Sequence, residues 1–206
     1  MTDQRIVKRF AVPDRPMRIL SPFARAWFAD PRRVGAIAPS GRSLARLITR
    51  QLGASSGPVI EIGPGTGVFT DAILKSGVRA DQLVLIERSA SLATALRYKF
   101  PDVRVIEADA SALAGSLFGA GVVGAVISGI PILTMPDADV RALLTLAFDE
   151  LRVGGAFFQF TYGLRCPIGR SVLAGLKLHA ERVGTTVRNL PPATVYRITR
   201  INERHH

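Results

Sequence analysis

The chain has 206 residues, 48% of them apolar, and its 27 Lys and Arg residues outweigh its 16 Asp and Glu residues to give a net charge of +11. This length and apolar content predict one globular domain with a sizeable core and exclude an intrinsically disordered chain. No apolar run approaches the roughly 20 residues needed to cross a bilayer, and no apolar signal core is present near the start. The single cysteine, Cys166, excludes a disulfide framework and fits a reducing cytoplasm. The positive charge predicts a polyanionic partner, either nucleic acid or an anionic membrane.

Residues 1–40 predict a basic, amphipathic helical extension. Its apolar side chains recur at helical spacing and share one face. They are Leu20, Phe23, Ala24, Trp27 and Phe28. A short basic helix with Trp and Phe on its apolar face suits the headgroup region of a bilayer. We therefore take Arg18, Arg25, Trp27 and Phe28 as candidate membrane contacts, although a helix packed on its own domain, or a lid, would show the same pattern.

The next segment, residues 41–58, predicts a second amphipathic helix and a turn. The apolar positions of this helix are Leu44, Leu47, Ile48 and Leu52. Arg42, Arg46 and Arg50 lie four residues apart on another face of it. The turn-rich stretch 53–58 then leads into the first strand.

Residues 59–67, Val-Ile-Glu-Ile-Gly-Pro-Gly-Thr-Gly, predict a buried strand that runs into a three-glycine turn. Gly63, Gly65 and Gly67 remove three side chains within five residues, which permits a left-handed turn or the close approach of a ligand to the backbone. Apolar residues at helical spacing follow the last glycine, so we expect the N-terminus of a helix to face the loop. Glu87 ends a second apolar run about 20 residues later, where a carboxylate can accept both ribose hydroxyls of an adenosine-containing ligand.

The glycine spacing narrows the choice of cofactor. A dinucleotide loop, Gly-x-Gly-x-x-Gly, would need glycine at Val68 or Thr70, and the Gly-Lys-Ser/Thr tripeptide of a phosphate-binding loop does not occur. The pattern Glu-x-Gly-x-Gly-x-Gly instead resembles the first motif of class I S-adenosylmethionine-dependent methyltransferases. In that family the loop packs against the methionine part of the cofactor, and the acid after the second strand holds the ribose. The resemblance implies cofactor contacts from Glu61, Gly63, Gly65, Thr66, Gly67 and Glu87; a glycine-rich turn without a ligand is the alternative.

Beyond Glu87 the chain alternates between predicted helices and strands. Helices are expected near residues 92–100 and over 137–151, the second closed by Gly154-Gly155. Further strands are expected at 103–106, 122–128, 156–162, 182–188 and 194–201. This order predicts an α/β fold, a doubly wound Rossmann-like sheet of seven strands of the methyltransferase type with an antiparallel C-terminal hairpin, formed by residues 41–206.

In such a sheet, ligands bind at the carboxyl ends of the strands, around the point where the strand order reverses. Asp109 follows the third strand and could accept a hydrogen bond from the adenine amino group, or could cap a helix. Ser128-Gly-Ile-Pro131 follows the fourth strand and should line the point of methyl transfer, where its carbonyls can accept an N–H from the nucleophile. Tyr162 ends the fifth strand at the same edge.

A nucleic-acid methyltransferase is the alternative that the net charge supports. Enzymes that methylate amino groups of adenine or cytosine commonly have Asp/Asn-Pro-Pro-Tyr/Phe in the loop after the fourth strand, and the aromatic ring stacks on the flipped base. Here Ser128 takes the first position and Ile132 follows the proline, so no ring is available. An rRNA or tRNA methyltransferase is therefore the second hypothesis, and a binding protein that uses the fold without catalysis is the third.

Five strings of residues carry a more specific resemblance. They are Val34-Gly-Ala-Ile-Ala-Pro-Ser-Gly41, Glu61-Ile-Gly-Pro-Gly-Thr-Gly67, Val126-Ile-Ser-Gly-Ile-Pro131, Gln159-Phe-Thr-Tyr-Gly163 and Asn189-Leu-Pro-Pro-Ala193. Together they resemble the small bacterial phospholipid N-methyltransferases, over about residues 20–200. The resemblance implies stepwise methylation of phosphatidylethanolamine to its monomethyl and dimethyl forms and to phosphatidylcholine, with S-adenosylhomocysteine as the other product.

The same resemblance implies further site residues and a location. Ser40, Ala110 and Ser128 are added to the predicted cofactor contacts. Ser128 and Tyr162 are the catalytic candidates, and the Tyr162 ring either faces the methylated ammonium or is packed in the core. The predicted lipid contacts are Gly129, Ile130, Pro131, Tyr162 and Asn189. Methyl transfer from a sulfonium is an in-line displacement, so the chain mainly aligns donor and acceptor and excludes water. Burial lowers the pKa of the attacking amine, so we expect no strong dedicated base. We expect no metal, because neither His179 nor the terminal His205-His206 makes a metal cluster. We expect a monomeric, cytoplasmic protein, peripheral on the inner leaflet, without a nucleic-acid partner.

Overall fold

The computed structural model describes residues 39–115, 117–189 and 191–201. The predicted helix with Arg18, Arg25, Trp27 and Phe28 lies outside the described residues. Within the described ranges, no helix combines the length and the apolar character that a membrane span requires.

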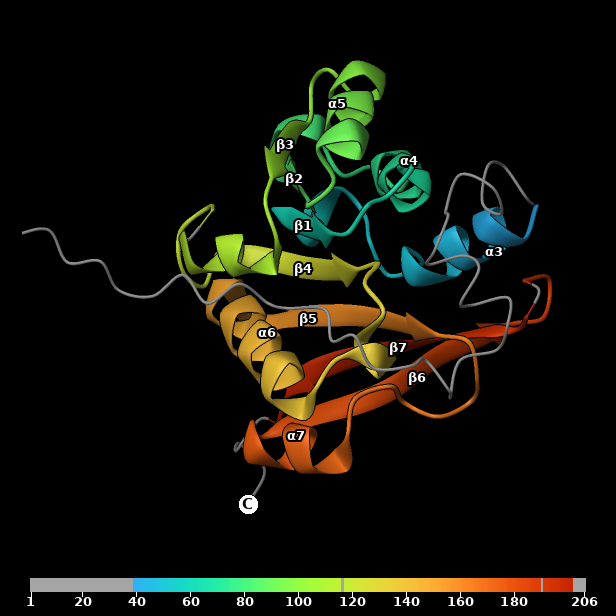
Figure 1. Ribbon diagram of the computed structural model, residues 1–206, viewed down its shortest axis with the longest axis vertical. Coiled ribbons are helices and arrows are strands. Elements are labelled where there is room, and N and C mark those ends of the chain that lie inside the picture. Colours follow the sequence, from blue (N-terminus) through green and yellow to red (C-terminus); the bar gives the residue numbers. More distant parts are fainter. Residues whose placement is uncertain (1–38, 116, 190, 202–206) are drawn as a thin grey trace, which may run out of the picture.

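The described residues build a seven-stranded sheet with the strand order β3-β2-β1-β4-β5-β7-β6 (Figure 1). Its strands are β1 (Val59–Ile62), β2 (Leu83–Glu87), β3 (Arg104–Glu107), β4 (Val123–Ser128), β5 (Leu151–Thr161), β6 (Leu178–Thr186) and β7 (Ala193–Arg200). Strands β1 to β5 pair in parallel, whereas β7 pairs antiparallel with both β5 and β6. The predicted doubly wound sheet with an antiparallel C-terminal hairpin is confirmed.

The central strands are buried on both faces, as their composition predicts. Every residue of β1 and of β2 is buried. Side chains alternate across a strand, so Val59 packs into one core and Ile60 into the core on the opposite face. A parallel sheet with two apolar faces needs helices on both of them.

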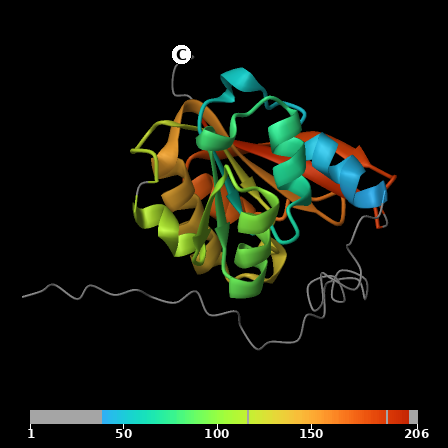
Figure 2. The ribbon, with the colours of Figure 1, turned by 90° about the horizontal axis from the view of Figure 1, so that it is seen from above.

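Helices supply these two outer layers, as Figures 1 and 2 show. Their bounds are α3 (Pro39–Ile48), α4 (Val68–Lys75), α5 (Ala90–Lys99), α6 (Asp137–Glu150) and α7 (Arg170–Gly175). On one face, α3, α4 and α5 pack through Ile48, Ile73 and Leu96. On the other, α6 and α7 pack through Leu144 and Val172.

The largest difference from the predicted boundaries lies between α6 and β5. Helix α6 ends at Glu150 and β5 begins at Leu151, so Gly154-Gly155 lies inside the strand and does not close the helix. The register of β4 against β5 shifts at this point, and Gly154 has a φ of 79°. Such a conformation is typical of a glycine in a β-bulge. The glycine pair, which was predicted to end the helix, therefore allows a bulge in the strand. A second difference is α7, a short helix that was not predicted.

Candidate functional site

The loops after β1, β2, β3 and β4 meet at one edge of the sheet, because these parallel strands all end there. The strand order reverses between β1 and β4, since β2 and β3 continue on one side and β5 on the other. Ligands of doubly wound sheets bind in the crevice at this point. The site is therefore built around the loops that follow β1 and β4.

These two loops touch through a pair of glycines. A Cβ on Gly129 would lie 2.4 Å from the carbonyl oxygen of Gly63, and a Cβ on Gly63, whose φ is +68°, would lie 2.7 Å from Cγ2 of Ile130. The Gly129 N–H also donates to the carbonyl of Ile62 at 2.8 Å. The backbones thus approach more closely than any side chain would permit.

Glu87, the last residue of β2, holds the glycine loop. Its Oε2 accepts a hydrogen bond from the Gly65 N–H at 3.1 Å, and its Oε1 accepts one from the Ser89 N–H at 2.8 Å. Gly65 has a φ of +57°, and apart from its two chain neighbours no described residue has an atom within 4 Å of the position that its Cβ would take. The loop is thus tied to the acid on one side and open to a ligand on the other.

A cavity of about 250 Å³ lies beside Glu87. The predicted site residues that line it are Gly63, Glu87, Asp109, Ala110, Ile130 and Pro131. Its volume is close to the lower end of the roughly 300–1,000 Å³ typical of small-molecule sites. The carboxylates of Glu87 and Asp109 suit hydroxyl and amino donors, and the apolar Ile86, Met135 and Leu143 in its lining suit an aromatic base. These acceptors and apolar side chains fit the adenosine part of S-adenosylmethionine.

Several lining residues were missed in the sequence. Arg88 follows Glu87 directly, and Met135, Asp139 and Leu143 come from the segment that enters α6 and from α6 itself. The apolar periodicity of α6 indicated only that one face of the helix points inward. No local motif distinguishes a residue that faces the cavity from one that faces the core.

Hydrogen bonds shape the loop that follows β4. The Ile130 carbonyl accepts from Gln159 Nε2 at 3.1 Å and from the Ile132 N–H at 3.0 Å. The Pro131 carbonyl accepts from Thr134 Oγ1 at 2.8 Å and from the Thr134 N–H at 3.0 Å. Since a carbonyl has two lone pairs, both of these acceptors are already saturated. Ser128, in contrast, is fully buried, and its hydroxyl has no hydrogen-bond partner among the described residues.

A second, smaller cavity of about 20 Å³ also adjoins this loop. Ile130 and Pro131 line it together with Tyr162, so these residues are shared between the two cavities. Burial raises the pKa of the Tyr162 phenol to about 12, partly offset by a hydrogen bond with the Asn189 side chain. The structure thus brings together two predicted lipid contacts, Tyr162 and Asn189, at the predicted point of methyl transfer.

Glu61 lies behind the glycine loop and is not among the residues that line the cavity. It is fully buried, and its Oε2 accepts a hydrogen bond from Thr70 Oγ1 at 2.6 Å. Burial raises the pKa of this carboxyl to about 8, against the lowering effect of Thr70. Glu61 is therefore a neutral acid at neutral pH that links β1 to α4.

The remaining predicted cofactor contacts lie toward α3 and α4. Ser40 belongs to the first turn of α3. Thr66 and Gly67 line a separate groove between α3 and α4, and Gly67 is the N-cap residue of α4. Direct cofactor contacts by these three residues, and by the other predicted contact residues, stay predictions.

The strand order, the glycine loop and the acid after β2 together define the class I S-adenosylmethionine-dependent methyltransferase fold. No protein-family model matches the chain. An ornithine lipid N-methyltransferase of Singulisphaera acidiphila is 28% identical over 145 residues, which cover 68% of this chain and 76% of that protein. A ribosomal RNA small subunit methyltransferase A of Dehalococcoides mccartyi is 44% identical over 54 residues, which cover 25% of this chain and 18% of that protein.

Among solved structures, the 1,6-didemethyltoxoflavin-N1-methyltransferase of Burkholderia thailandensis with bound S-adenosylhomocysteine superimposes with a TM-score of 0.60. The alignment covers 92% of this chain and 94% of that chain at 16% sequence identity. The similarity confirms the predicted fold. Together with the cavity beside Glu87, it supports S-adenosylmethionine as the cofactor.

Proposed function

We propose that the protein transfers methyl groups from S-adenosylmethionine to the amine of a phospholipid headgroup, namely phosphatidylethanolamine and its monomethyl and dimethyl forms. The loop after β4 carries the proposal, because Ile130 and Pro131 line both the cofactor cavity and the small cavity of Tyr162. A methyl donor in the larger cavity and an amine near Tyr162 would both contact this loop. The similarity to an ornithine lipid N-methyltransferase supports a lipid amine as the acceptor.

The reaction needs alignment more than acid–base catalysis. When bound beside Glu87 and Asp109, S-adenosylmethionine would supply the methyl group: the amine lone pair would form the new N–C bond as the sulfonium S–C bond broke, which would leave S-adenosylhomocysteine. The proton that the amine loses goes to water. Since the Ile130 and Pro131 carbonyls are saturated, we assign the amine N–H to the Ser128 hydroxyl or the Gly129 carbonyl. Tyr162, with a pKa of about 12, stays protonated and offers its ring to the ammonium.

The location of the substrate implies a membrane-associated protein. We propose that residues 1–40 are the docking extension, that residues 41–206 form the catalytic domain, and that the protein is peripheral on the inner leaflet. The basic and aromatic composition of the extension supports this assignment. Vesicle flotation of the full chain and of a chain that lacks residues 1–29 would test it, and unchanged flotation of the shortened chain would contradict it.

RNA methylation is the second candidate function. The short match to ribosomal RNA methyltransferases and the net charge of +11 favour it. Against it, the residue after Pro131 is Ile132, which is buried and opens a 3-10 turn, so the loop presents no aromatic ring to a flipped base.

One labelling experiment separates these candidates. The full chain is incubated with methyl-labelled S-adenosylmethionine and, in separate reactions, with phosphatidylethanolamine vesicles, ornithine lipid vesicles or ribosomal RNA. Label in phosphatidylethanolamine supports the proposal. Label in ornithine lipid alone would keep a lipid amine but replace the acceptor, and label in RNA alone would overturn the proposal.

A further inference from the structure

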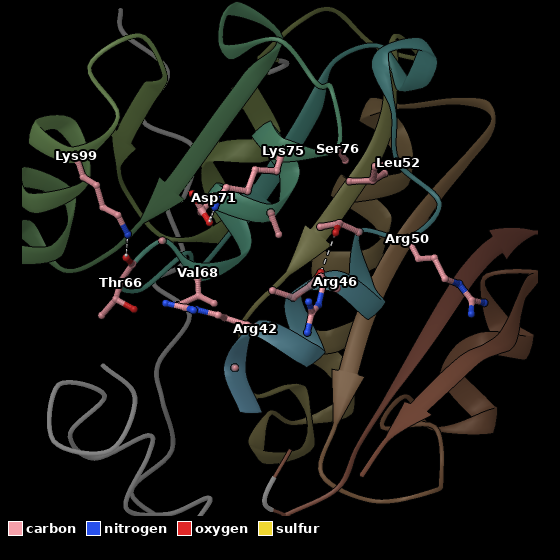
Figure 3. A pocket seen from close by; sticks show the side chains of 15 residues that line it. Arg42, Arg46, Arg50, Leu52, Thr66, Val68, Asp71, Lys75, Ser76 and Lys99 are labelled. Atoms are coloured by element: carbon pink, nitrogen blue, oxygen red, sulfur yellow. Dashed lines mark hydrogen bonds and ion pairs between the residues drawn. The ribbon is translucent and has the colours of Figure 1, made fainter. Parts of the chain in front are cut away.

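A groove of about 860 Å³ is lined mainly by residues of α3 and α4 (Figure 3). Thr66, Gly67 and Val68 line it, whereas Gly63 at the other end of the same loop lines the cofactor cavity. The groove is thus separate from the site described above but shares the glycine loop with it.

Positive charge dominates the groove. Its lining includes five cations and one carboxylate: Arg42, Arg46, Arg50, Lys75, Lys99 and Asp71. The carboxylate of Asp71 lies 2.7 Å from Lys75 Nζ, so it is already neutralised. Arg50 donates to the Val183 carbonyl at 2.9 Å, and Lys99 donates to the Thr66 carbonyl at 3.0 Å.

Two of these cations are available to a ligand. Arg42 and Arg46 are exposed, and neither has a hydrogen bond or ion pair with another described residue. They lie four residues apart on α3, so they occupy the same face of the helix. Figure 3 shows both side chains extending from α3, with Val68 close to Arg42. A guanidinium group offers several N–H donors in a planar fork that suits phosphate oxygens.

The other lining residues indicate what kind of phosphate compound fits. The uncharged side chains of the lining are the apolar Ala45, Leu52, Val68 and Ala72 and the hydroxyl-bearing Thr49, Thr66 and Ser76. None of the 15 lining residues is aromatic, whereas sites for single-stranded nucleic acid commonly stack bases on aromatic rings. A cationic groove with hydroxyl and apolar side chains and no ring suits a phospholipid headgroup better than an RNA strand.

The chain's own N-terminal segment is disfavoured as the occupant. Residues 1–38 carry eight Lys and Arg residues and three Asp residues. Their net positive charge would oppose entry into a groove that is itself positive.

We propose that the groove between α3 and α4 binds the phosphate headgroups of anionic phospholipids through Arg42 and Arg46. Because Thr66 and Gly67 belong to both the groove and the glycine loop, this contact places the cofactor loop at the membrane surface, where a lipid amine is delivered. The choice of a membrane over other polyanions rests on the proposed lipid substrate. Headgroup binding itself does not depend on methyl transfer.

The first test measures binding of the full chain to vesicles of phosphatidylcholine with and without phosphatidylglycerol. Neither lipid is a methyl acceptor, so the result is independent of whether the proposed reaction occurs. The variant Arg42→Gln/Arg46→Gln is compared with the control Arg104→Gln/Arg152→Gln. The control removes the same charge from two exposed residues at the N-terminal ends of β3 and β5. Each cation at an anionic surface contributes about 1 kcal/mol, or about a factor of five in the partition coefficient. We therefore expect the partition coefficient of the groove variant on anionic vesicles to fall about 30-fold, and that of the control variant to fall less.

The second test detects lipid in the groove itself, so that vesicle binding by residues 1–40 does not produce the signal. In a Cys166→Ser background, Ser76→Cys in the groove lining and Ser55→Cys outside it carry a polarity-sensitive fluorophore. We expect anionic vesicles to shift the emission to shorter wavelength at position 76 but not at position 55. Thermal melts and S-adenosylhomocysteine binding verify that each variant folds.

The proposal fails if the groove and control variants lose vesicle binding equally, because net charge alone would then explain the loss. It also fails if neither loses binding, or if the emission at position 76 does not change. A loss of binding to ribosomal RNA with unchanged vesicle binding would assign the groove to nucleic acid.

Discussion

The carboxylate of Glu87 accepts a hydrogen bond from the N–H of Gly65 at 3.1 Å, so the acid that ends β2 restrains the loop that follows β1. The two residues are 22 positions apart in the chain, and only the parallel pairing of β1 with β2 makes them neighbours. Glu87 lines the cofactor cavity as well. One side chain therefore shapes the glycine loop and faces the ligand.

Replacing Glu87 by Gln should weaken cofactor binding and loosen the glycine loop, because the amide keeps only one of the two acceptor oxygens. The amide loses the charged acceptor, and hydrogen bonds to charged groups contribute about 1.5–3 kcal/mol, so the Kd for S-adenosylhomocysteine should rise about 10- to 100-fold. Isothermal titration calorimetry measures this change. Glu107→Gln is the matched control, since Glu107 pairs with Glu87 in the sheet register but is exposed and ends β3 outside the cavity. Equal losses in both variants would contradict the assignment.

Gly129→Ala should destabilise the fold and disturb the cofactor cavity. The new Cβ would lie 2.4 Å from the Gly63 carbonyl oxygen, so the two loops must separate. Overpacking of this kind costs about 1–3 kcal/mol of the free energy of unfolding, which urea denaturation measures.

The control for this variant is Gly41→Ala on α3. Its Cβ would lie 3.9 Å from Val68 Cγ1, an ordinary contact. Alanine is favoured over glycine within a helix by about 0.5–1 kcal/mol. The control should therefore be neutral or stabilising, and a stable Gly129→Ala variant would show that the loops do not need their close approach.

Tyr162 should act through its ring and not as a base. Its pKa of about 12 keeps the phenol protonated well above neutral pH. Tyr162→Phe should therefore retain most of the lipid methylation and show the same dependence on pH between about 7 and 10. Tyr162→Leu removes the ring and should raise KM about 2- to 30-fold, which corresponds to a cation–π contribution of about 0.5–2 kcal/mol. A new loss of activity at alkaline pH in Tyr162→Phe alone would argue for a proton-transfer role.

Glu61 should make the stability of the protein depend on pH. Its folded-state pKa, about 8, lies above the ordinary value of 4.5 because of burial. Below pH 4.5 the carboxyl is protonated in both states and its contribution is fully present. Between these values the unfolded chain releases the proton and the folded chain keeps it, so the free energy of unfolding falls as pH rises, by at most about 1.4 kcal/mol per pH unit.

Urea denaturation at about pH 5, 6.5 and 8 measures this slope. Glu61→Gln cannot ionise yet retains an oxygen that can accept from Thr70, so its stability should be flatter over this range. The exposed Glu107→Gln variant should keep the slope of the original chain. A slope that Glu61→Gln leaves unchanged would show that other groups cause it.

The elements that sequence analysis predicted well are those with a strong local cause. The apolar, β-branched Val59, Ile60 and Ile62 predict a strand buried on both faces, and this strand lies at the centre of the sheet. The irregular part of β5 was predicted wrongly, because Gly154-Gly155 follows a helix as a C-terminal stop would. Whether the two glycines end the helix or form a bulge in a strand depends on their pairing with β4. Because β4 is distant in the chain, the residues beside the glycines do not indicate this pairing.

The same division holds for the site. The glycine loop, Glu87 and the Ser128–Pro131 loop follow from spacing, because each sits at a strand end and the parallel order brings strand ends together. Met135 and Leu143 became cavity residues only through the packing of α6 on the sheet, and Arg42 and Arg46 became part of a groove only because α3 lies beside α4. Local patterns determine which residues form strands, turns and helix faces, whereas contacts between distant segments decide which of those faces enclose a ligand.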